Sequence, residues 1–282
     1  MKKILNLFLL LLMSISSLAQ ESIVFEAKFK PNKIYKSHIK SSSSGEIEFI
    51  ADKEIIDQMK SRGLELPIVT EEITDLSTEI TTYDLDENGE FLAKLEYGKM
   101  ISTKTINEKT SSEELPFSNM KILGKYDVEN KFKIDSILGE NVTQQMRDVL
   151  KVTLENVQAA IKFPEKPMMV GDVFNSEIPM AIPLEGMRPI SVKIDMEYLL
   201  TEIKDGIAFF DINQSLSLDM SQDQLNMMAS GEGVGTSSFD IKENYIVQYT
   251  SELPMDMIIE INDKMTMKMK MITKSDQKVT IE

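Results

Sequence analysis

The stretch MDMIIEINDKMTMKMKM, residues 255–271, is the clearest guide to how this chain folds. Apolar side chains recur there at every second position, first on Met255, Met257, Ile259 and Ile261 and then on Met265, Met267, Met269 and Met271. Because successive side chains of a β-strand point to opposite faces, this period of two predicts two strands, each with one apolar face. Asn262-Asp263 lies between them and supplies turn chemistry, so we predict a β-hairpin.

The same alternation runs through most of the remaining chain. It covers residues 73–85, 91–97, 131–137, 190–203, 207–218 and 239–253. Turn sequences such as Asp86–Gly89 and Lys204–Gly206 separate neighbouring segments. Antiparallel strands with one buried and one solvated face have this pattern. We therefore predict a mainly β fold (β-rich α+β), with antiparallel sheets that form an open half-barrel or two related β units.

Three segments depart from the period of two. Residues 141–163 place their apolar side chains on one helical face, and a proline follows at 164, which predicts one long helix. Residues 52–62 predict a short helix that Gly63 ends, and residues 221–230 predict a third helix by the same signals. The alternate glycines at 231, 233 and 235 predict a bulge or bend at the entry to the strand at Phe239.

The two halves of the chain resemble each other in the order of their turns. Each half has a Lys-Pro pair (30–31 and 166–167), a hairpin glycine (Gly89 and Gly206) and an aromatic-aspartate pair (126–127 and 239–240). This order predicts a first β unit over residues 20–140 and a second over 164–282, linked by the helix at 141–163. A single continuous domain is the alternative, and any two runs of hairpins share some likeness by chance.

Residues 1–19 have the pattern of a cleavable secretory signal peptide. Lys2 and Lys3 precede an apolar run over 4–13, and Ser17 and Ala19 are small residues at the positions that signal peptidase reads. That run is about half of the ~20 residues that span a bilayer, so we expect no transmembrane anchor. The chain has no cysteine, so we expect neither lipidation at the cut nor disulfides. We predict an exported protein, in the periplasm first and at the cell surface or outside the cell as alternatives.

The charge balance restricts the partners. The chain has 46 Asp and Glu against 31 Lys and Arg, a net charge of −15. Nucleic acids and anionic lipid surfaces are themselves negative and would be repelled. We therefore predict no nucleic-acid partner, whereas cations and basic partners stay open.

Catalytic, metal and cofactor chemistry lack most of their usual residues. His38 is the only histidine, so a Ser-His-Asp triad would need it, and no Gly-x-Ser-x-Gly motif is present. One histidine and no cysteine leave zinc, haem and iron–sulfur sites without their common ligands. Residues 84–89 copy half of a calcium loop, but Leu95 stands where the loop needs a bidentate Glu, so a hairpin turn explains them better. We nominate no catalytic, cofactor-binding or metal residue.

The chain has 20 methionines, and three interpretations compete for those of residues 255–271. Methionine fills irregular gaps in an ordinary core. It also lines deformable pockets, so the face could hold a lipid or another apolar small molecule. Thioethers are soft ligands, so Cu(I) is the third interpretation. The candidate apolar ligand face consists of Met255, Met257, Ile259, Met265, Met267, Met269 and Met271.

Four short motifs carry a resemblance to a family of secreted proteins. They are Ser17-x-Ala19-Gln20, the two Lys-Pro pairs, Gly171-Asp172-x-Phe174, and the run from Phe239 through the methionine hairpin. With these motifs the chain resembles a Bacteroidota family known only as a domain of unknown function. The resemblance covers nearly the whole chain after residue 19 and implies no catalytic residue. The expected half-barrel is also similar in architecture to periplasmic lipoprotein carriers, although fold alone does not fix function.

These observations lead to one functional hypothesis and two alternatives. We predict a non-catalytic extracytoplasmic protein that binds an apolar or lipid-like ligand on the methionine-rich sheet face. A structural or envelope-interaction protein is the alternative. A hydrolase that uses carboxylates not identifiable from the sequence is the third.

Overall fold

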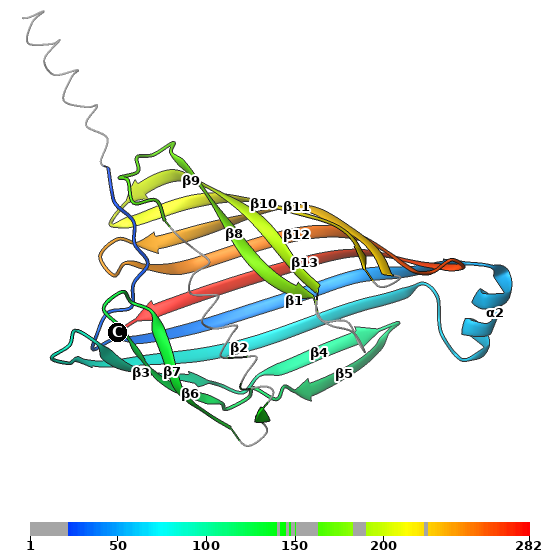
Figure 1. The fold of residues 1–282 in the computed structure, drawn as a ribbon, viewed down its shortest axis with the longest axis horizontal. Coiled ribbons are helices and arrows are strands. Elements are labelled where there is room, and N and C mark those ends of the chain that lie inside the picture. Colours follow the sequence, from blue (N-terminus) through cyan, green and yellow to red (C-terminus); the bar gives the residue numbers. More distant parts are fainter. Residues whose placement is uncertain are drawn as a thin grey trace, which may run out of the picture.

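One antiparallel sheet forms almost the whole molecule. The computed structural model describes residues 22–139, 142–144, 147, 150, 163–182, 190–222 and 225–282. The described strands are β1 (Ile34–Ala51), β2 (Ile68–Leu85), β3 (Phe91–Tyr97), β4 (Ile101–Ile106), β5 (Lys109–Glu114), β6 (Lys121–Tyr126), β7 (Phe132–Leu138), β8 (Val173–Ile182), β9 (Ile190–Lys204), β10 (Ile207–Gln222), β11 (Leu225–Asp240), β12 (Tyr245–Asn262) and β13 (Met265–Ile281). The sheet is curved and is not closed into a barrel (Figure 1). The predicted mainly β, open antiparallel fold is confirmed.

The strand order joins the two ends of the chain in the middle of the sheet. The order is β7-β6-β3-β2-β1-β13-β12-β11-β10-β9-β8, so β1 pairs with β13. The hairpin β4–β5 lies off this path and pairs with β2 at Thr70–Asp75, whereas β3 pairs with β2 from Thr78 onward. Both halves of the chain therefore contribute to a single continuous sheet.

The turns that look alike in the two halves occupy corresponding places. Gly89 lies between β2 and β3 and Gly206 between β9 and β10, and both have positive φ angles, of 78° and 79°. Asp127 starts the turn after β6, where its Oδ1 accepts from the Glu129 and Lys131 N–H groups. Asp240 does the same after β11, accepting from the Glu243 N–H at 2.9 Å. The two halves of the sheet therefore have the same order of turns. That they arose by duplication of one β unit stays a prediction.

The helix predictions had different outcomes. α2 (Lys53–Ser61) confirms the short helix, which connects β1 to β2 and buries no residue. Most of the expected helix at 141–163 lies outside the described residues; within it, Gln144, Arg147 and Leu150 are helical. The helix over 221–230 is wrong, because its described residues lie in β10 and β11. The expected signal peptide, residues 1–19, also lies outside the described residues.

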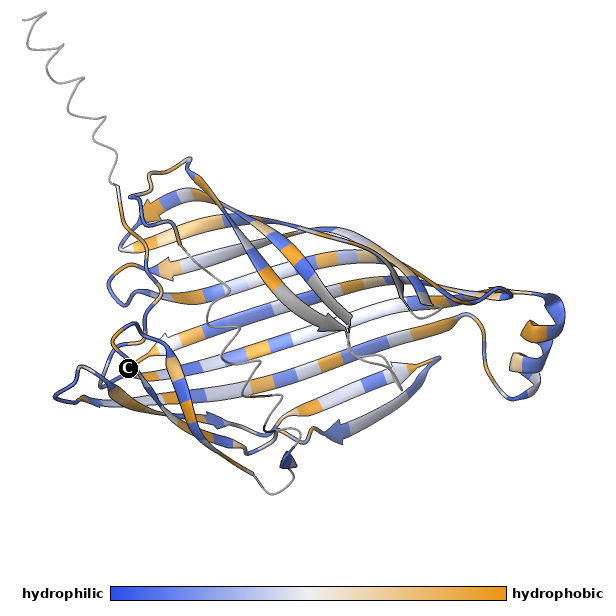
Figure 2. Cartoon of the chain, viewed as in Figure 1, coloured by the Kyte–Doolittle hydropathy of each residue, from blue (hydrophilic) through white to orange (hydrophobic). Residues whose placement is uncertain are grey.

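The sheet is amphipathic, and hydrophobic and hydrophilic residues alternate along its strands (Figure 2). We call the face that carries the buried side chains the inner face and the opposite, charged face the outer face. Three core clusters lie on the inner face. The first surrounds Phe210 on β8–β11, the second surrounds Tyr126 on β3, β6 and β7, and the third surrounds Met227 on β10–β13. Burial of this face supplies the main drive for folding.

A segment before β1, residues 22–31, joins the first two clusters, and we call it the N-terminal strap. Ile23 forms a bridge with Met168, and Phe25 packs its ring against three aromatic rings of the first cluster. Phe29 inserts into the second cluster, where its ring centroid lies 4.8 Å from that of Tyr126. The strap therefore fastens elements from both halves of the chain, along one end of the sheet (Figure 1).

Three alternate glycines let β11 approach β12 closely. A Cβ atom at Gly231, Gly233 or Gly235 would lie 2.3–2.5 Å from a carbonyl oxygen of β12. Real Cβ atoms do not come so near to backbone oxygen, so only glycine fits there. The glycine spacing predicted a bulge or bend on entry to Phe239, and the register between β11 and β12 shifts there, between Ser238 and Phe239, as at a β-bulge.

Candidate functional site

The predicted methionine face is formed by two strands that lie side by side. Met255 pairs with Met271, Met257 with Met269 and Ile259 with Met267 in the antiparallel register of β12 and β13. All of these side chains lie on the inner face, because the third core cluster contains or contacts most of them. The sequence predicted each apolar face separately, and the register places both on the same side of the sheet.

The face is divided between core and groove. Met257 and Ile259 are buried, with 8% and 4% of their surface exposed, and they pack with Met227 and Leu216. Met255, Met267 and Met269 are only partly buried against that cluster, and Met265 and Met271 are also partly exposed. Ile261, which the alternation placed on the same face, lies instead at a β-bulge and is 37% exposed. The extra residue of the bulge shifts the register there.

An apolar groove of about 490 Å³ opens beside the exposed methionines. We call it the methionine groove. It crosses β13, β1, β2 and β4, and the loop after α2 adds Leu64. Its apolar lining consists of Ile47, Leu64, Ile68, Ile106, Met269 and Met271. Its polar lining consists of Ser43, Thr70, Glu72 and Lys104.

The floor of the groove contains a glycine that makes room for a methionine. Gly45 lies opposite both Met271 and Thr70 in the sheet register. A Cβ atom at Gly45 would lie 2.9 Å from Cγ of Met271 and 2.5 Å from the Lys270 carbonyl oxygen. The Met271 side chain therefore lies over Gly45, and a larger residue there would displace it.

The polar end of the groove contains a buried hydroxyl and two opposite charges. Ser102 is buried, and its Oγ donates to Oε1 of Glu72 at 2.7 Å. Lys104 lies directly across the strand pair from Glu72. No carboxylate in the described part of the chain lies within ion-pair distance of the Lys104 ammonium. The groove thus has an apolar end and a charged end.

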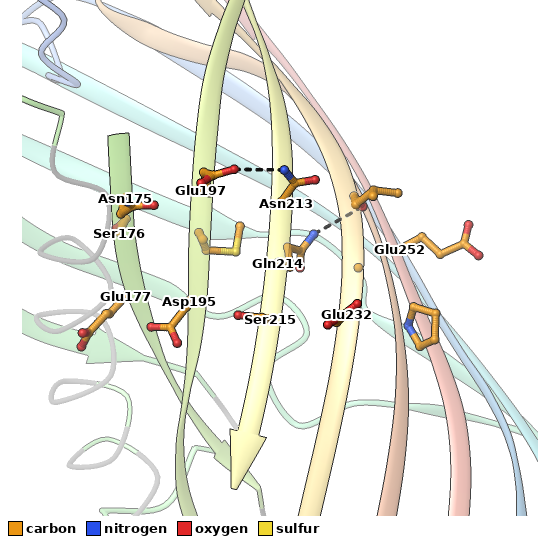
Figure 3. Close-up of a pocket in the computed structure, with 14 residues that line it drawn as sticks. Asn175, Ser176, Glu177, Asp195, Glu197, Asn213, Gln214, Ser215, Glu232 and Glu252 are labelled. Atoms are coloured by element: carbon orange, nitrogen blue, oxygen red, sulfur yellow. Dashed lines mark hydrogen bonds between the residues drawn. The ribbon is translucent and has the colours of Figure 1, made fainter. Parts of the chain in front are cut away.

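A larger groove, of about 900 Å³, lies on the outer face (Figure 3). It runs between two rows of side chains across β8–β12, and we call it the acidic furrow. Its carboxylates are Glu177, Asp195, Glu197, Glu232 and Glu252. Lys193 lies 2.6 Å from Glu177, Lys274 lies 3.1 Å from Glu252, and Asn213 donates to Glu197 at 3.1 Å. Three of the five carboxylates of the acidic furrow, Glu177, Glu252 and Glu197, are therefore engaged in ion pairs or hydrogen bonds.

The furrow does not gather a metal site. Across the described residues, no group of three or more His, Asp or Glu side chains is placed to hold a metal ion. The side-chain hydrogen bond to Glu177, with the charges of Glu177 and Asp195, raises the pKa of Lys193. Lys193 therefore stays protonated and balances the two carboxylates, which face each other across β8 and β9.

His38 does not assemble a catalytic triad. Its Nδ1 atom lies 3.2 Å from Ser77 Oγ and 3.5 Å from Asp75 Oδ1. In a triad, the serine and the carboxylate engage different ring nitrogens, so that the base can take the proton from serine while the acid holds the ring. Both contacts here fall on one nitrogen, and the side chains of His38 and Asp75 are more than half exposed. His38 is therefore a surface side chain in a hydrogen-bonded cluster on the outer face.

The partial calcium loop is a hairpin turn between β2 and β3. Asp86 Oδ1 accepts from the N–H groups of Asn88 at 2.8 Å and Glu90 at 2.9 Å. These backbone hydrogen bonds, that of Glu90 first, lower the pKa of the Asp86 carboxyl below its ordinary value. A carboxylate so engaged shapes the turn, as expected from the Asn88-Gly89 pair.

Sequence reasoning missed most of the groove wall, including Ile47, Ile68, Ile106, Glu72 and Lys104. Their strands are far from residues 255–271 in the chain, and the local alternation does not show which strands become neighbours. One signal was available, because Ile47 and Phe49 alternate with Glu46 and Glu48 as the methionines alternate with lysines. It also missed Tyr198, whose buried hydroxyl has no hydrogen-bond partner among the described residues and whose pKa is raised by burial.

Comparison with known proteins gives only distant likenesses. The sequence matches no family model and no curated protein. The translocator domain of autotransporter NalP from Neisseria meningitidis is 9% identical, covers 87% of this chain and 88% of its own, and has a TM-score of 0.22. The InvG secretin domain beta-barrel from the Salmonella SPI-1 injectisome is also 9% identical, over 98% of this chain and 66% of its own, at 0.16. Scores this low support no argument about function.

The described residues contain no helix with the length and apolar composition needed to cross a membrane.

Proposed function

We propose that this protein is a non-catalytic, exported binding protein that holds an apolar or lipid-like ligand in the methionine groove. One observation carries the proposal: partly exposed methionines and isoleucines line a 490 Å³ groove on the inner face of an open sheet. Removing such an apolar surface from water by covering it with a ligand lowers the free energy by about 25 cal/mol per Å². Methionine side chains adapt to ligands of varied shape.

Competing interpretations explain less of the face. Ordinary core packing accounts for Met257 and Ile259, which are buried. It does not explain why the surfaces of Met269 and Met271 that line the groove are apolar and exposed. A Cu(I) site would use thioethers alone, since the chain has no cysteine and its single histidine is on the outer face. An apolar ligand uses the isoleucines as well as the methionines.

Native extraction tests the proposal. Protein purified without detergent is extracted with organic solvent, and the extract is analysed by mass spectrometry. We expect a reproducible apolar compound in the wild type and less of it in Met269→Gln and Met271→Gln. Met228→Gln is the matched control, because Met228 is 46% exposed on the outer face of β11. An extract without any such compound, and no displacement of an apolar dye by lipids, would refute binding and favour a structural role.

Export is part of the proposal, with the periplasm as the expected location. The pattern of residues 1–19 supports it, and the fold is compatible with a cut before Gln20, because the first strap contact begins at Ile23. N-terminal sequencing of protein from fractionated cells tests it. A mature chain that starts at Gln20 in the periplasmic fraction is expected, and an uncut cytoplasmic chain would contradict it.

A further inference from the structure

The methionine groove changes from apolar to polar along the strand direction, in three rows of side chains. Met269, Ile47 and Ile68 form the first row, across β13, β1 and β2. This row is entirely apolar. It lies toward the end of the sheet where α2 connects β1 and β2 (Figure 1).

The second and third rows bring in polar groups. Met271, Gly45, Thr70 and Ile106 make up the second row. Ser43, Glu72 and Lys104 belong to the third row, which is polar throughout. Same-face residues lie two strand positions apart, so the three rows span about 13 Å. A ligand that matches this surface has an apolar tail over the first row and a polar head at the third.

The charges of the third row select the head group. Glu72 is already engaged by the Ser102 hydroxyl at 2.7 Å. Lys104 has three N–H donors and no carboxylate within ion-pair distance among the described residues. A carboxylate or phosphate on the ligand would form an ion pair with the Lys104 ammonium. Such a charge-assisted hydrogen bond is stronger than a hydrogen bond between neutral groups.

We infer that the ligand of the methionine groove is an amphiphile with an anionic head group, held at Lys104, and an apolar tail. The inference rests on the proposed function and adds the class and the orientation of the ligand. Lys104 positions the head, and Met271, which lies over Gly45, lines the path of the tail. The neighbouring Glu72 weakens the attraction for the anionic head by repulsion.

Three probes of equal tail length test the inference: dodecanoate, dodecanol and dodecylamine, each below the concentration at which it aggregates. Binding is measured by displacement of an apolar fluorescent dye and by calorimetry at neutral pH. We expect the wild type to bind dodecanoate about tenfold more tightly than dodecanol, and dodecylamine most weakly. The preference for dodecanoate should fall as salt is added, because Lys104 is solvent-exposed.

Variants separate the head from the tail. Lys104→Gln should bring dodecanoate to the affinity of dodecanol, and Glu72→Gln, which keeps the hydrogen bond from Ser102, should strengthen dodecanoate binding. Lys270→Gln is the matched control, because Lys270 lies next to Met271 but on the outer face, opposite Asp256 and Glu46. It should leave all three affinities unchanged. Circular dichroism and thermal unfolding check that each variant is folded.

The outcomes distinguish the two claims. If none of the three probes displaces the dye from the wild type, the proposed function itself fails. If dodecanol binds as tightly as dodecanoate, or if Lys104→Gln keeps the preference, the inference about the head group is wrong and apolar binding stands. If dodecylamine binds most tightly, the site selects cations at Glu72 and the anionic assignment is overturned.

Discussion

Met227 and Met228 are adjacent in the chain and differ almost completely in burial, and this contrast yields a sharp prediction. Met227 is 0% exposed in the third core cluster, whereas Met228 is 46% exposed on the outer face. Replacing Met227 by alanine removes three buried heavy atoms, worth about 2.4 kcal/mol at roughly 0.8 kcal/mol each. The cavity left behind adds to this, so we expect Met227→Ala to destabilise the protein by about 3 kcal/mol. Met228→Ala should change stability by less than about 0.5 kcal/mol.

Urea unfolding of both variants and the wild type measures this difference. The unfolding midpoint of Met227→Ala should fall while the slope of the transition stays the same, because the folded sheet is retained. Equal losses for the two variants would refute the assignment of alternate faces, and so would a larger loss for Met228→Ala.

Three further perturbations test other parts of the fold. Phe25→Ala should cost about 3–5 kcal/mol because Phe25 is 3% exposed, whereas Val24→Ala, at a residue 56% exposed, should cost less than about 0.5 kcal/mol in the same urea assay. Gly233→Ala should cost about 1–3 kcal/mol, since its Cβ atom would meet the Glu252 oxygen at 2.4 Å; an unchanged midpoint would contradict the close approach of the strands. Burial raises the pKa of the Glu243 carboxyl, but nearby lysines lower it more, so it ends below its ordinary value of 4.5. The ionised Glu243 stabilises the fold above pH about 4.5, and this contribution is lost as the pH falls through the folded pKa. In Glu243→Gln the free energy of unfolding should therefore depend less on pH in the acid range.

The period of two predicted several strands and the faces that they bury. Residues 255–271 show why: one face must be apolar and the other solvated, and local alternation records that choice. The period of two left out β4, β5, β6 and β8, and residues 241–244, inside the predicted segment 239–253, form the turn between β11 and β12. The same reasoning failed at 221–230, where capping residues and a following glycine imitate a helix. There, Met227 and Met228 are the same residue type. They differ in burial because Met227 packs into the core cluster on the inner face and Met228 points to the outer face. Tertiary burial overrode the local signals.

The candidate site was half predictable. The methionines of β12 and β13 were identified because they are close in sequence and share one hairpin. Ile47, Ile68 and Lys104 complete the groove from three other strands. Which strands become neighbours depends on the pairing of distant segments, and nothing in the local pattern of Lys104 shows that it will line the same groove as Met271. Ile261 also escaped prediction, because a bulge inserts one extra residue without changing the alternation.

The pairing of β1 with β13 has a consequence for how the chain reaches its fold. Ser37 and Gln277 contact each other although 240 positions separate them, so the middle of the sheet is its least local part. Pairings of this kind form slowly, since a long loop must close before any contact is gained. Until β13 is in place, β1 and β12 are two long strands with open edges, ready to pair with another chain. Assembly of the centre is therefore the step at which this protein is most exposed to aggregation, and a holding chaperone would protect it most at that moment.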